Sequence, residues 1–296
     1  MAEFTSPRLI DVSRAVSPDT LLGLVPEGRI TACDFYVSGA ETGVEVPGGY
    51  QLGRILNIDH HAPATRMARQ VSSTNLALTH LAESGQPVSE GAVVINHTDC
   101  DSVLSAALLC GLLEPDARYG TAAIAADHTG EENPIADLLQ ALDPLRDFEF
   151  SMSSLTRLEQ GRPLSPTAAE MVSRRALHRQ RAAEFVAGGA FERRGCLAFA
   201  SLPERIDSTF LPALLPDACV ILVFLPTGVE GHREAKLRLG LAAPPGLTLH
   251  DLRIEEFDPA FGGRWNAGAN RRAGGTTLPI EAYVAALEQR LTRALV

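Results

Sequence analysis

Short apolar runs alternate with segments of helical periodicity along the first half of the chain. Residues 31–39 are predicted to form a strand running into a turn, and residues 54–58 and 92–96 are predicted strands, because each segment is dominated by apolar side chains. Residues 73–84 place apolar side chains at helical spacing, and Gly85 is positioned to end that helix. This alternation predicts an α/β fold with a mostly parallel sheet and helices on both faces.

Acidic and histidine residues stand directly after three of the apolar runs. They are Asp59, His97 and Asp127, the last of which follows residues 121–126, interpreted here as a further strand. In open parallel sheets, ligands bind beyond the carboxyl ends of the strands. The pattern therefore predicts a functional site built from these positions.

The second half of the chain differs from the first in composition and periodicity. A helix rich in Ala, Arg and Glu is predicted over residues 167–186, with prolines before it and two glycines after it. We therefore expect a first domain in residues 1–150, a connecting helix in 151–190, and a smaller α/β domain in 191–296. The strands predicted in this last part are 196–200, 219–225 and 236–241, and the helices are 206–215 and 279–294.

Composition and charge narrow the range of functions. The 296-residue chain is 45% hydrophobic and 21% charged, which is typical of a soluble globular protein. Its formal net charge of −10 disfavours long duplex nucleic acid, whereas a small phosphate ester stays compatible because bound divalent cations reverse the local field. The longest apolar run, residues 219–225, is too short to cross a membrane. Five cysteines without a Cys-x-x-Cys pair, and no secretion signal at the start, predict reduced thiols and a cytoplasmic protein.

Two segments have the residue types of a metal site. Asp59-His60-His61 offers a carboxylate and two imidazoles, with an ordinary surface loop as the alternative interpretation.

The other segment, residues 97–101, carries His97, Asp99 and Asp101 at alternate positions, which face the same side in an extended segment. The alternative is that Asp99 or Asp101 caps a helix, with His97 merely exposed. A helix is predicted over residues 101–113, with Asp101 or Ser102 as its cap.

The third cluster, Asp127-His128-Thr129-Gly130, is compatible with either a metal ligand or a simple turn. Taken together, the three clusters provide carboxylates and imidazoles but no thiolate, a ligand set that favours Mn²⁺ or Mg²⁺ over structural zinc. Two such ions can clamp a phosphate, activate a water and stabilise the leaving oxygen. The sequence therefore predicts a metal-dependent reaction at phosphorus.

A glycine-rich stretch near the C-terminus is a candidate phosphate-binding loop. Residues 261–268 (FGGRWNAG) are followed by Arg271 and Arg272. Glycines let the backbone approach a ligand closely, free N–H groups can hold an oxyanion, and arginines suit phosphate. Trp265, the only tryptophan, can stack on a base. The alternative is a glycine-rich surface loop with a tryptophan in the core.

These segments together resemble the DHH phosphoesterase superfamily with its DHH-associated C-terminal domain. Residues 55–85 (ILNIDHHAPATRMARQVSSTNLALTHLAESG) are similar to the namesake motif and its following helix. Residues 97–108 (HTDCDSVLSAAL) are similar to the His-x-Asp-x-Asp motif, and residues 236–269 are similar to the strand, helix and glycine-rich loop of the associated domain. The resemblance touches most of the chain, but only these segments are specific.

The resemblance implies two Mn²⁺ or Mg²⁺ ions, with His61 facing the scissile phosphate and Asp59 as its catalytic partner. The implied metal ligands are Asp34, Asp59, His60, His97, Asp99, Asp101 and Asp127. The implied substrate-binding residues are Arg238, Gly262, Gly263, Arg264, Asn266 and Arg271.

The sequence departs from the family pattern in three places. The His-x-Asp-x-Asp motif follows the Asp-His-His motif here, whereas it precedes that motif in the family. Ser102 replaces the usual glycine after the second Asp, and Arg264 replaces the usual histidine of the glycine-rich loop. The two motifs can still share metal ions if their strand ends converge in space.

We therefore expect a phosphoesterase that hydrolyses a small nucleotide, cyclic dinucleotide or short oligonucleotide with a two-metal-activated water. The expected partner is a small phosphorylated substrate or a short single-stranded oligonucleotide, no membrane partner is expected, and a homodimer is left open. The alternatives are a non-catalytic nucleotide- or phosphate-binding relative and an inorganic pyrophosphatase-like enzyme. Trp265 separates a nucleotide from pyrophosphate, because a stacking aromatic has no use on an inorganic substrate.

Overall fold

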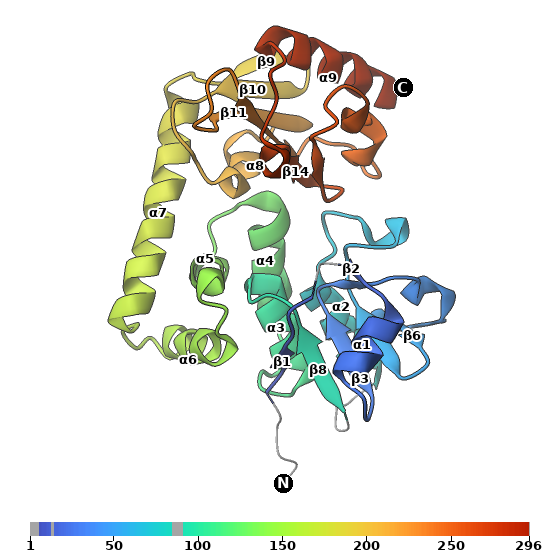
Figure 1. The fold of residues 1–296 in the computed structure, drawn as a ribbon. Helices are drawn as coiled ribbons and strands as arrows, with labels where there is room; N and C mark the ends of the chain where they lie inside the picture. The colour runs from blue at the N-terminus through green and yellow to red at the C-terminus, as the bar shows by residue number, and fades with distance from the viewer. Residues whose placement is uncertain (1–5, 13–14, 85–90, 296) are drawn as a thin grey trace. The chain divides into compact units, whose positions relative to one another are not determined.

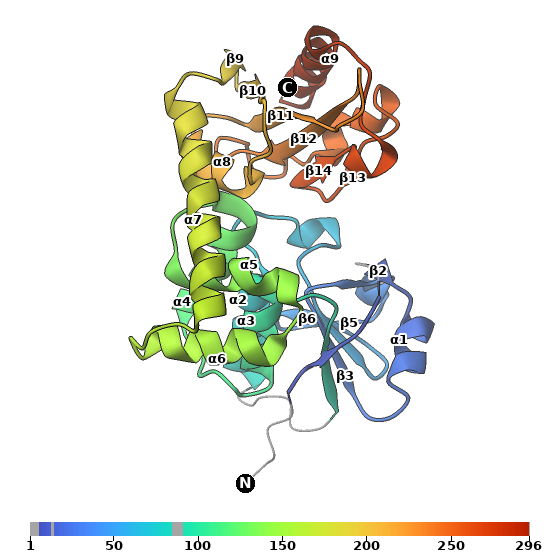
Figure 2. The same ribbon diagram turned by 60° about the vertical axis from the view of Figure 1, so that its left-hand side comes forward.

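The chain forms two compact units in a computed structural model that describes residues 6–12, 15–84 and 91–295 (Figures 1 and 2). Unit 1 comprises Met1–Asp127 and Glu132–Arg175, and unit 2 comprises His128–Glu131 and Ala176–Val296. Gly85, expected to end a helix, lies outside the described residues. Within the described ranges, no helix has the length and apolar character needed to cross a membrane.

A six-stranded sheet forms the centre of unit 1. Its strands are β1 (Arg8–Leu9), β3 (Ile30–Cys33), β5 (Val44–Val46), β6 (Gly49–Leu52), β7 (Ile55–Ile58) and β8 (Ala92–Ile95), in the spatial order β1-β8-β3-β7-β6-β5. The first four strands of that order run parallel, and β6 and β5 add antiparallel pairs at one edge. A separate parallel pair joins β2 (Ala15–Val16) to β4 (Tyr36–Val37).

Both faces of this sheet are buried, because successive strand residues point to opposite sides. Ile58 and Ile95 face a core shared with the larger group of helices, whereas Ile55 and Val94 face a second core that contains Leu21. Leu21 belongs to α1 (Pro18–Leu24), and the other helices are α2 (Ser73–Ser84), α3 (Cys100–Leu109), α4 (Ala117–Ile124), α5 (Pro134–Leu142) and α6 (Phe148–Glu159). The predicted fold class is confirmed.

The direction of strand addition reverses at β3. β7 follows β3 in the chain and pairs on one side of it; the chain then passes through α2, and β8 pairs on the other side of β3. The carboxyl ends of β8, β3 and β7 are therefore neighbours at a topological switch point, where open α/β sheets bind their ligands.

Unit 2 is built on a second six-stranded sheet, in the order β13-β14-β12-β11-β10-β9. β10 and β11 are parallel, and all other pairs are antiparallel. The strands are β9 (Glu192–Arg194), β10 (Leu197–Ser201), β11 (Val220–Pro226), β12 (Arg233–Leu239), β13 (Gly262–Gly263) and β14 (Ala267–Ala269). The helices are α7 (Pro166–Ala187), whose second half belongs to this unit, α8 (Leu211–Leu214) and α9 (Ile280–Ala294).

Short 3-10 segments complete the chain. They are η1 (Ala40–Thr42), η2 (Ala64–Arg66), η4 (Asp143–Leu145), η5 (Ser208–Phe210), η6 (His250–Leu252), η7 (Ile254–Glu256) and η8 (Arg271–Ala273). One segment, η3 (Ala125–Thr129), is a π-helix.

Three local predictions are wrong. Residues 121–126 are not a strand, because they continue α4 into the π-helix η3. The segment 97–101 is not extended throughout, because Asp99 is the N-cap of α3 and Asp101 already lies in its first turn. That helix also ends at Leu109 rather than at residue 113. Residues 31–39 do form a strand running into a turn, because β3 ends at Cys33 and the chain turns at Asp34 before β4.

Candidate functional site

Asp34 lies at the centre of the candidate site, directly after β3. It adopts a left-handed backbone conformation (φ 59°), which Asp tolerates better than most residues, and its N–H donates to Ile58 O at 3.0 Å. Because β7 and β8 end on either side of β3, residues 59–61 and residues 97–101 both reach the Asp34 carboxylate. The reversed order of the two motifs along the chain therefore does not separate them in space.

One half of the cluster surrounds the ring of His60. His60 Nε2 lies 3.6 Å from Asp34 Oδ1, 3.6 Å from Asp101 Oδ2 and 3.3 Å from Asp127 Oδ2. All four side chains are at most 4% exposed. Three carboxylates thus face a single imidazole nitrogen in a buried environment.

The other half surrounds the ring of His97. His97 Nε2 lies 3.1 Å from Asp34 Oδ2 and 3.2 Å from Asp99 Oδ2. Ser102 Oγ donates to Asp34 Oδ2 at 2.8 Å and lies 3.1 Å from His97 Nε2. Asp34 therefore presents one oxygen to each half, which is how one carboxylate can bridge two cations.

His61 stands apart from its neighbour His60. Its Nδ1 lies 2.6 Å from Asp59 Oδ1 and 3.8 Å from Asp34 Oδ1, and its side chain is 11% exposed whereas that of His60 is 1% exposed. One oxygen of Asp59 therefore orients the His61 ring. The other, Oδ2, is buried and has no hydrogen-bond partner within the described residues.

Hydrogen bonds at Nδ1 fix the orientation of the other two rings. His60 Nδ1 lies 3.1 Å from Val71 O, and His97 Nδ1 bonds to Asn96 Oδ1. Both partners are acceptors, so each ring carries its proton on Nδ1 and turns Nε2 toward the carboxylates. Metal-binding histidines are held in this way by a carbonyl or carboxylate on their second nitrogen.

Asp101 has several donors from the protein itself. Its Oδ2 accepts from Ser73 N at 2.7 Å, and its Oδ1 accepts from Thr74 N at 2.7 Å and from Thr74 Oγ1 at 2.6 Å. The carboxylate therefore also satisfies the N-terminus of α2. Asp99 is likewise a cap, because its Oδ1 accepts from Ser102 N at 3.1 Å. Capping and proximity to the cluster thus occur together in these two residues.

Sequence reasoning missed four residues that touch the cluster. Ser73 Oγ donates to Asp34 Oδ1 at 2.9 Å, and Thr74, Ser102 and Asn96 make the contacts already described. The run Ser72-Ser73-Thr74 at the start of a predicted helix is the signal that could have found two of them, because free N–H groups at a helix start attract carboxylates.

The pKa values in the cluster depart strongly from their ordinary values. Burial raises the pKa of Asp34, but the hydrogen bond to His97 and the charges of three histidines outweigh this and lower it well below the usual range. Burial lowers the pKa of His97, but Asp99 and Asp34 outweigh this and raise it well above the usual range. Burial and the charge of Asp34 raise the pKa of Asp101. A cation bound at the cluster would compete with protons for these groups.

The residues present fit a pair of hard divalent cations. Buried carboxylates close together repel one another unless positive charge is placed between them, and the unpaired Asp59 Oδ2 is a further donor of this kind. The donors are carboxylate oxygens and imidazole nitrogens, and the unit's cysteines Cys33 and Cys100 do not suit the task because burial raises the pKa of both thiols. Oxygen-rich mixed sites of this type suit Mn²⁺ or Mg²⁺.

The glycine-rich segment of unit 2 forms a tight hairpin. Gly263 pairs with Gly268 across β13 and β14, and a Cβ on Gly263 would lie 2.3 Å from Gly268 Cα, so only glycine permits this approach. Arg264 N donates to Ala267 O at 2.7 Å, so this N–H belongs to the hairpin and is not a free oxyanion donor. Gly262 and Gly263 are exposed, and Arg264 is half-buried.

Of the remaining residues predicted to bind substrate, two lie next to one another. Arg238 on β12 pairs in register with Ala267 on β14, is buried, and donates from Nε to Ser208 Oγ at 3.3 Å. Asn266 is also buried, and its carbonyl accepts from Leu239 N at 2.9 Å. Arg271 is exposed in η8. The hairpin and β12 therefore bring Arg238 and Asn266 together.

Trp265 is a core residue of unit 2. Its side chain is 2% exposed, and its ring centroid lies 5.6 Å from that of His128 at an interplanar angle of 38°. The alternative of a tryptophan in the core therefore describes this residue, and its ring is not presented for stacking on a base.

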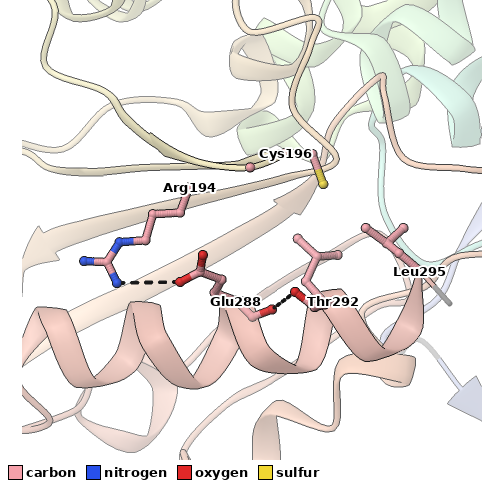
Figure 3. A pocket seen from close by; sticks show the side chains of 7 residues that line it. Arg194, Cys196, Glu288, Thr292 and Leu295 are labelled. Carbon is pink, nitrogen blue, oxygen red and sulfur yellow. Dashed lines mark hydrogen bonds and ion pairs between the residues drawn. The ribbon is translucent and has the colours of Figure 1, made fainter.

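A separate pocket of about 280 Å³ lies in unit 2 between the β9–β10 turn and the C-terminal part of α9 (Figure 3). Arg194 at its edge is ion-paired with Glu281 and Glu288. Cys196 contributes a thiol, and the remaining lining is Gly195, Leu291, Thr292 and Leu295. This pocket lacks the carboxylate and imidazole cluster, so the candidate chemistry belongs to unit 1.

Comparison with known proteins gives structural neighbours only. No family model matches the sequence, and no curated protein matches it. A pGpG-specific phosphodiesterase, PggH from Vibrio cholerae, is similar with a TM-score of 0.44 and 13% identity, over 83% of this chain and 81% of that one. An exopolyphosphatase-related protein from Bacteroides fragilis is similar with a TM-score of 0.36 and 18% identity, over 68% of this chain and 59% of that one. Both similarities are weak in sequence and partial in structure.

Proposed function

We propose that the chain is a metal-dependent phosphoesterase of the DHH type, with a small nucleotide, cyclic dinucleotide or short oligonucleotide as substrate. The observation that carries the proposal is the convergence of residues 59–61 and 97–101 on the two oxygens of Asp34. Two motifs that resemble one family's metal motifs meet in space although their chain order is reversed. If residues 59–61 were only a surface loop, or residues 97–101 only a helix cap, nothing would require the two segments to lie together.

The cofactor in this proposal is a pair of Mn²⁺ or Mg²⁺ ions. Such ions supply a Lewis acid for the phosphoryl oxygens and a nucleophile from water at neutral pH. The residues that would hold them are Asp34, His60, His97, Asp99, Asp101 and Asp127, with Asp59 Oδ2 as a further donor.

The chain's own residues orient the rings and move protons. Asp59 holds His61 at Nδ1, so His61 Nε2 is left to accept a proton from, or donate one to, an oxygen at the reacting phosphate. Ser102, Ser73 and Thr74 fix the carboxylates of Asp34 and Asp101 from the protein side. Preorganised ligands of this kind need little rearrangement when charge develops on the phosphate.

Unit 2 would bind the rest of the substrate in this proposal. Arg238 and Arg264 provide positive charge, and Gly262 and Gly263 allow close backbone approach, as the family resemblance implies.

The proposal is tested by hydrolysis of bis-p-nitrophenyl phosphate, a linear dinucleotide, a cyclic dinucleotide and pyrophosphate, each with Mn²⁺ or Mg²⁺. We expect metal-dependent turnover of at least one phosphodiester, and a loss of about 100-fold or more in His61→Ala, the usual size of a general acid-base contribution. His178→Ala is the matched control, because His178 is an exposed histidine on α7. Absence of turnover with every metal and substrate would overturn the proposal.

A pyrophosphatase-like activity is the second candidate function. The burial of Trp265 favours it, because a buried ring cannot stack on a base. Since this ring is 2% exposed, no aromatic platform from Trp265 selects a nucleotide over an inorganic substrate. Turnover of pyrophosphate without any phosphodiester would select this candidate. Binding of Mn²⁺ and a nucleotide without turnover would instead identify a non-catalytic relative.

A further inference from the structure

Two consecutive residues of the π-helix η3 belong to different units. Asp127 packs with unit 1, whereas His128 to Glu131 pack with unit 2, and the chain returns to unit 1 at Glu132. A single peptide bond therefore joins a residue of the metal cluster to the unit that carries the glycine-rich hairpin. π-Helical turns are rare and occur often at functional sites.

The side chain of Asp127 is committed to unit 1. Its Oδ2 lies 3.3 Å from His60 Nε2, and the residue is 4% exposed. It comes from η3, beyond the end of α4, and not from a strand of the sheet. Asp34 is held between two strands. The position of Asp127 depends instead on the conformation of the η3 residues that follow it.

The side chain of His128 contacts two residues of unit 2. Asn266 Nδ2 lies 3.1 Å from His128 Nδ1, and the His128 ring packs beside Trp265. Both Asn266 and His128 are buried. The ring of His128 is thereby held by the hairpin residues that connect β13 to β14.

The residues after His128 are anchored to unit 2 at two further points. Gly130 has a positive φ of 70°, and a Cβ there would lie 2.0 Å from Thr209 O, so the backbone is packed directly against η5. Arg179 NH1 donates to Gly130 O at 2.7 Å. The four-residue segment is therefore fixed by side-chain and backbone contacts and cannot shift independently of unit 2.

We propose that His128, held by Asn266, is a positioning residue for the metal ligand Asp127. The inference rests on the proposed function of the cluster, and it adds a route by which the hairpin of unit 2 determines the geometry of one metal ligand in unit 1. The peptide bond between the two residues is planar and has one soft dihedral on either side, ψ of Asp127 and φ of His128, so a displaced His128 moves the Asp127 carboxylate. A ligand held loosely binds its metal more weakly, as happens when supporting contacts are removed.

The test measures the dissociation constant for Mn²⁺ alone by isothermal titration calorimetry, using the full chain. We expect His128→Ala and Asn266→Ala each to weaken Mn²⁺ binding about tenfold, the usual effect of losing an outer contact to a ligand. His128→Asn should stay within about threefold of the wild type, because its Oδ1 offers an acceptor near the position of Nδ1. The double variant should be no weaker than either single variant, since both remove the same contact.

A second pair of variants leaves His128 and Asn266 unchanged and alters a glycine instead. Gly130→Ala collides with Thr209 O, whereas Gly161→Ala carries similar backbone strain (φ 62°) with nothing within 4 Å of the new Cβ. We expect weaker Mn²⁺ binding in Gly130→Ala and wild-type binding in Gly161→Ala. The melting temperature in EDTA identifies any variant that fails to fold. If His128→Ala fails to fold, the comparison of Gly130→Ala with Gly161→Ala tests the positioning role instead.

The outcomes separate the two proposals. A wild type that neither binds Mn²⁺ nor hydrolyses any substrate overturns the proposed function. A wild type that does both, with His128→Ala and Gly130→Ala binding Mn²⁺ equally well, overturns only the positioning role. The role is also overturned if His128→Asn is as weak as His128→Ala while Asn266→Ala is unaffected, because His128 would then act as a ligand itself.

Discussion

Each unit buries aspartate, but in opposite surroundings. In unit 2, Asp258 Oδ2 accepts from Tyr283 OH at 3.0 Å and from Asn270 Nδ2 at 2.8 Å, beside the rings of Phe257 and Phe224, which pack on Tyr283. In unit 1, five buried aspartates lie together around histidines, and Asp59 Oδ2 has no hydrogen-bond partner in the described part of the chain. The fold satisfies the first arrangement by itself, and the second requires positive charge from outside.

The difference separates a structural carboxylate from a ligand. Neutral donors around a lone carboxylate remove its need for a counter-ion, so Asp258 stabilises its core. Several carboxylates that share imidazole partners retain unused negative charge, so the cluster is less stable alone than it is with cations. Substitutions in the two regions should therefore act on different measurements.

The largest effect is expected for Asp34→Asn, which removes the charge at the centre of the cluster. Loss of even an outer contact to a metal ligand weakens binding about 10- to 100-fold, so loss of the central carboxylate, which would hold the ions, should reduce Mn²⁺ affinity by at least about 100-fold. In EDTA, the melting temperature should fall, because His97, His61 and His60 lower the pKa of Asp34 and so stabilise its charged form in the folded protein. Calorimetric titration and thermal unfolding measure the two quantities, and an unchanged Mn²⁺ affinity would contradict the comparison.

An intermediate effect is expected for Asn270→Ala in unit 2. Asn270 donates to Asp258 and accepts from Ala235 N at 2.8 Å, so the substitution leaves the buried Ala235 N–H unpaired and removes one of the two donors to Asp258. We expect a loss of about 2–4 kcal/mol in the free energy of unfolding, from about 1–3 kcal/mol for the unpaired N–H and about 1 kcal/mol for the lost hydrogen bond to Asp258. Urea denaturation measures it, and the Mn²⁺ affinity of the folded protein should not change. Gln289→Ala, at an exposed position of α9, is a control that keeps wild-type stability.

The smallest effect is expected at Lys236, the single lysine of the chain, which shares the buried face of β12 with Arg238. Burial, and then the charge of Arg238, lowers the pKa of Lys236 below its ordinary value. The unfolded chain therefore binds this proton more tightly, and charged Lys236 reduces stability at pH values below its folded pKa. Lys236→Met should raise the melting temperature by roughly 1–3 °C at pH 7.

The rise in melting temperature caused by Lys236→Met should become smaller as the pH rises toward about 10.4, where the lysine of the unfolded chain loses its proton. Thermal unfolding at several pH values checks the sign. Because the chain has one lysine, reductive ¹³C-methylation gives one lysine resonance whose titration reports the pKa directly. A pKa at or above the ordinary value would show that β12 does not bury an excess of positive charge.

The strands and helices near the cluster could be read from local patterns. Helix α2 was predicted at its observed bounds, and β7 and β8 within one residue at each end, because short apolar runs and helical spacing report burial directly. The residue types of a metal site were also visible, since aspartates and histidines directly followed these runs. Asp127 was found for the wrong structural reason, because a helix of small apolar residues and a buried strand have the same local pattern.

By itself, the sequence determined the fold class and most of the elements near the cluster, and it predicted the candidate ligand types, because these depend on periodicity and side-chain chemistry. Only the tertiary structure decided that β8 crosses back beside β3, which brings two motifs in reversed order to the same carboxylate. It alone also showed that Ser73 and Thr74 hold Asp34 and Asp101, and that His128 joins Asp127 to the other unit. Strand order and the partners of a buried carboxylate depend on contacts between distant segments, which no local pattern records.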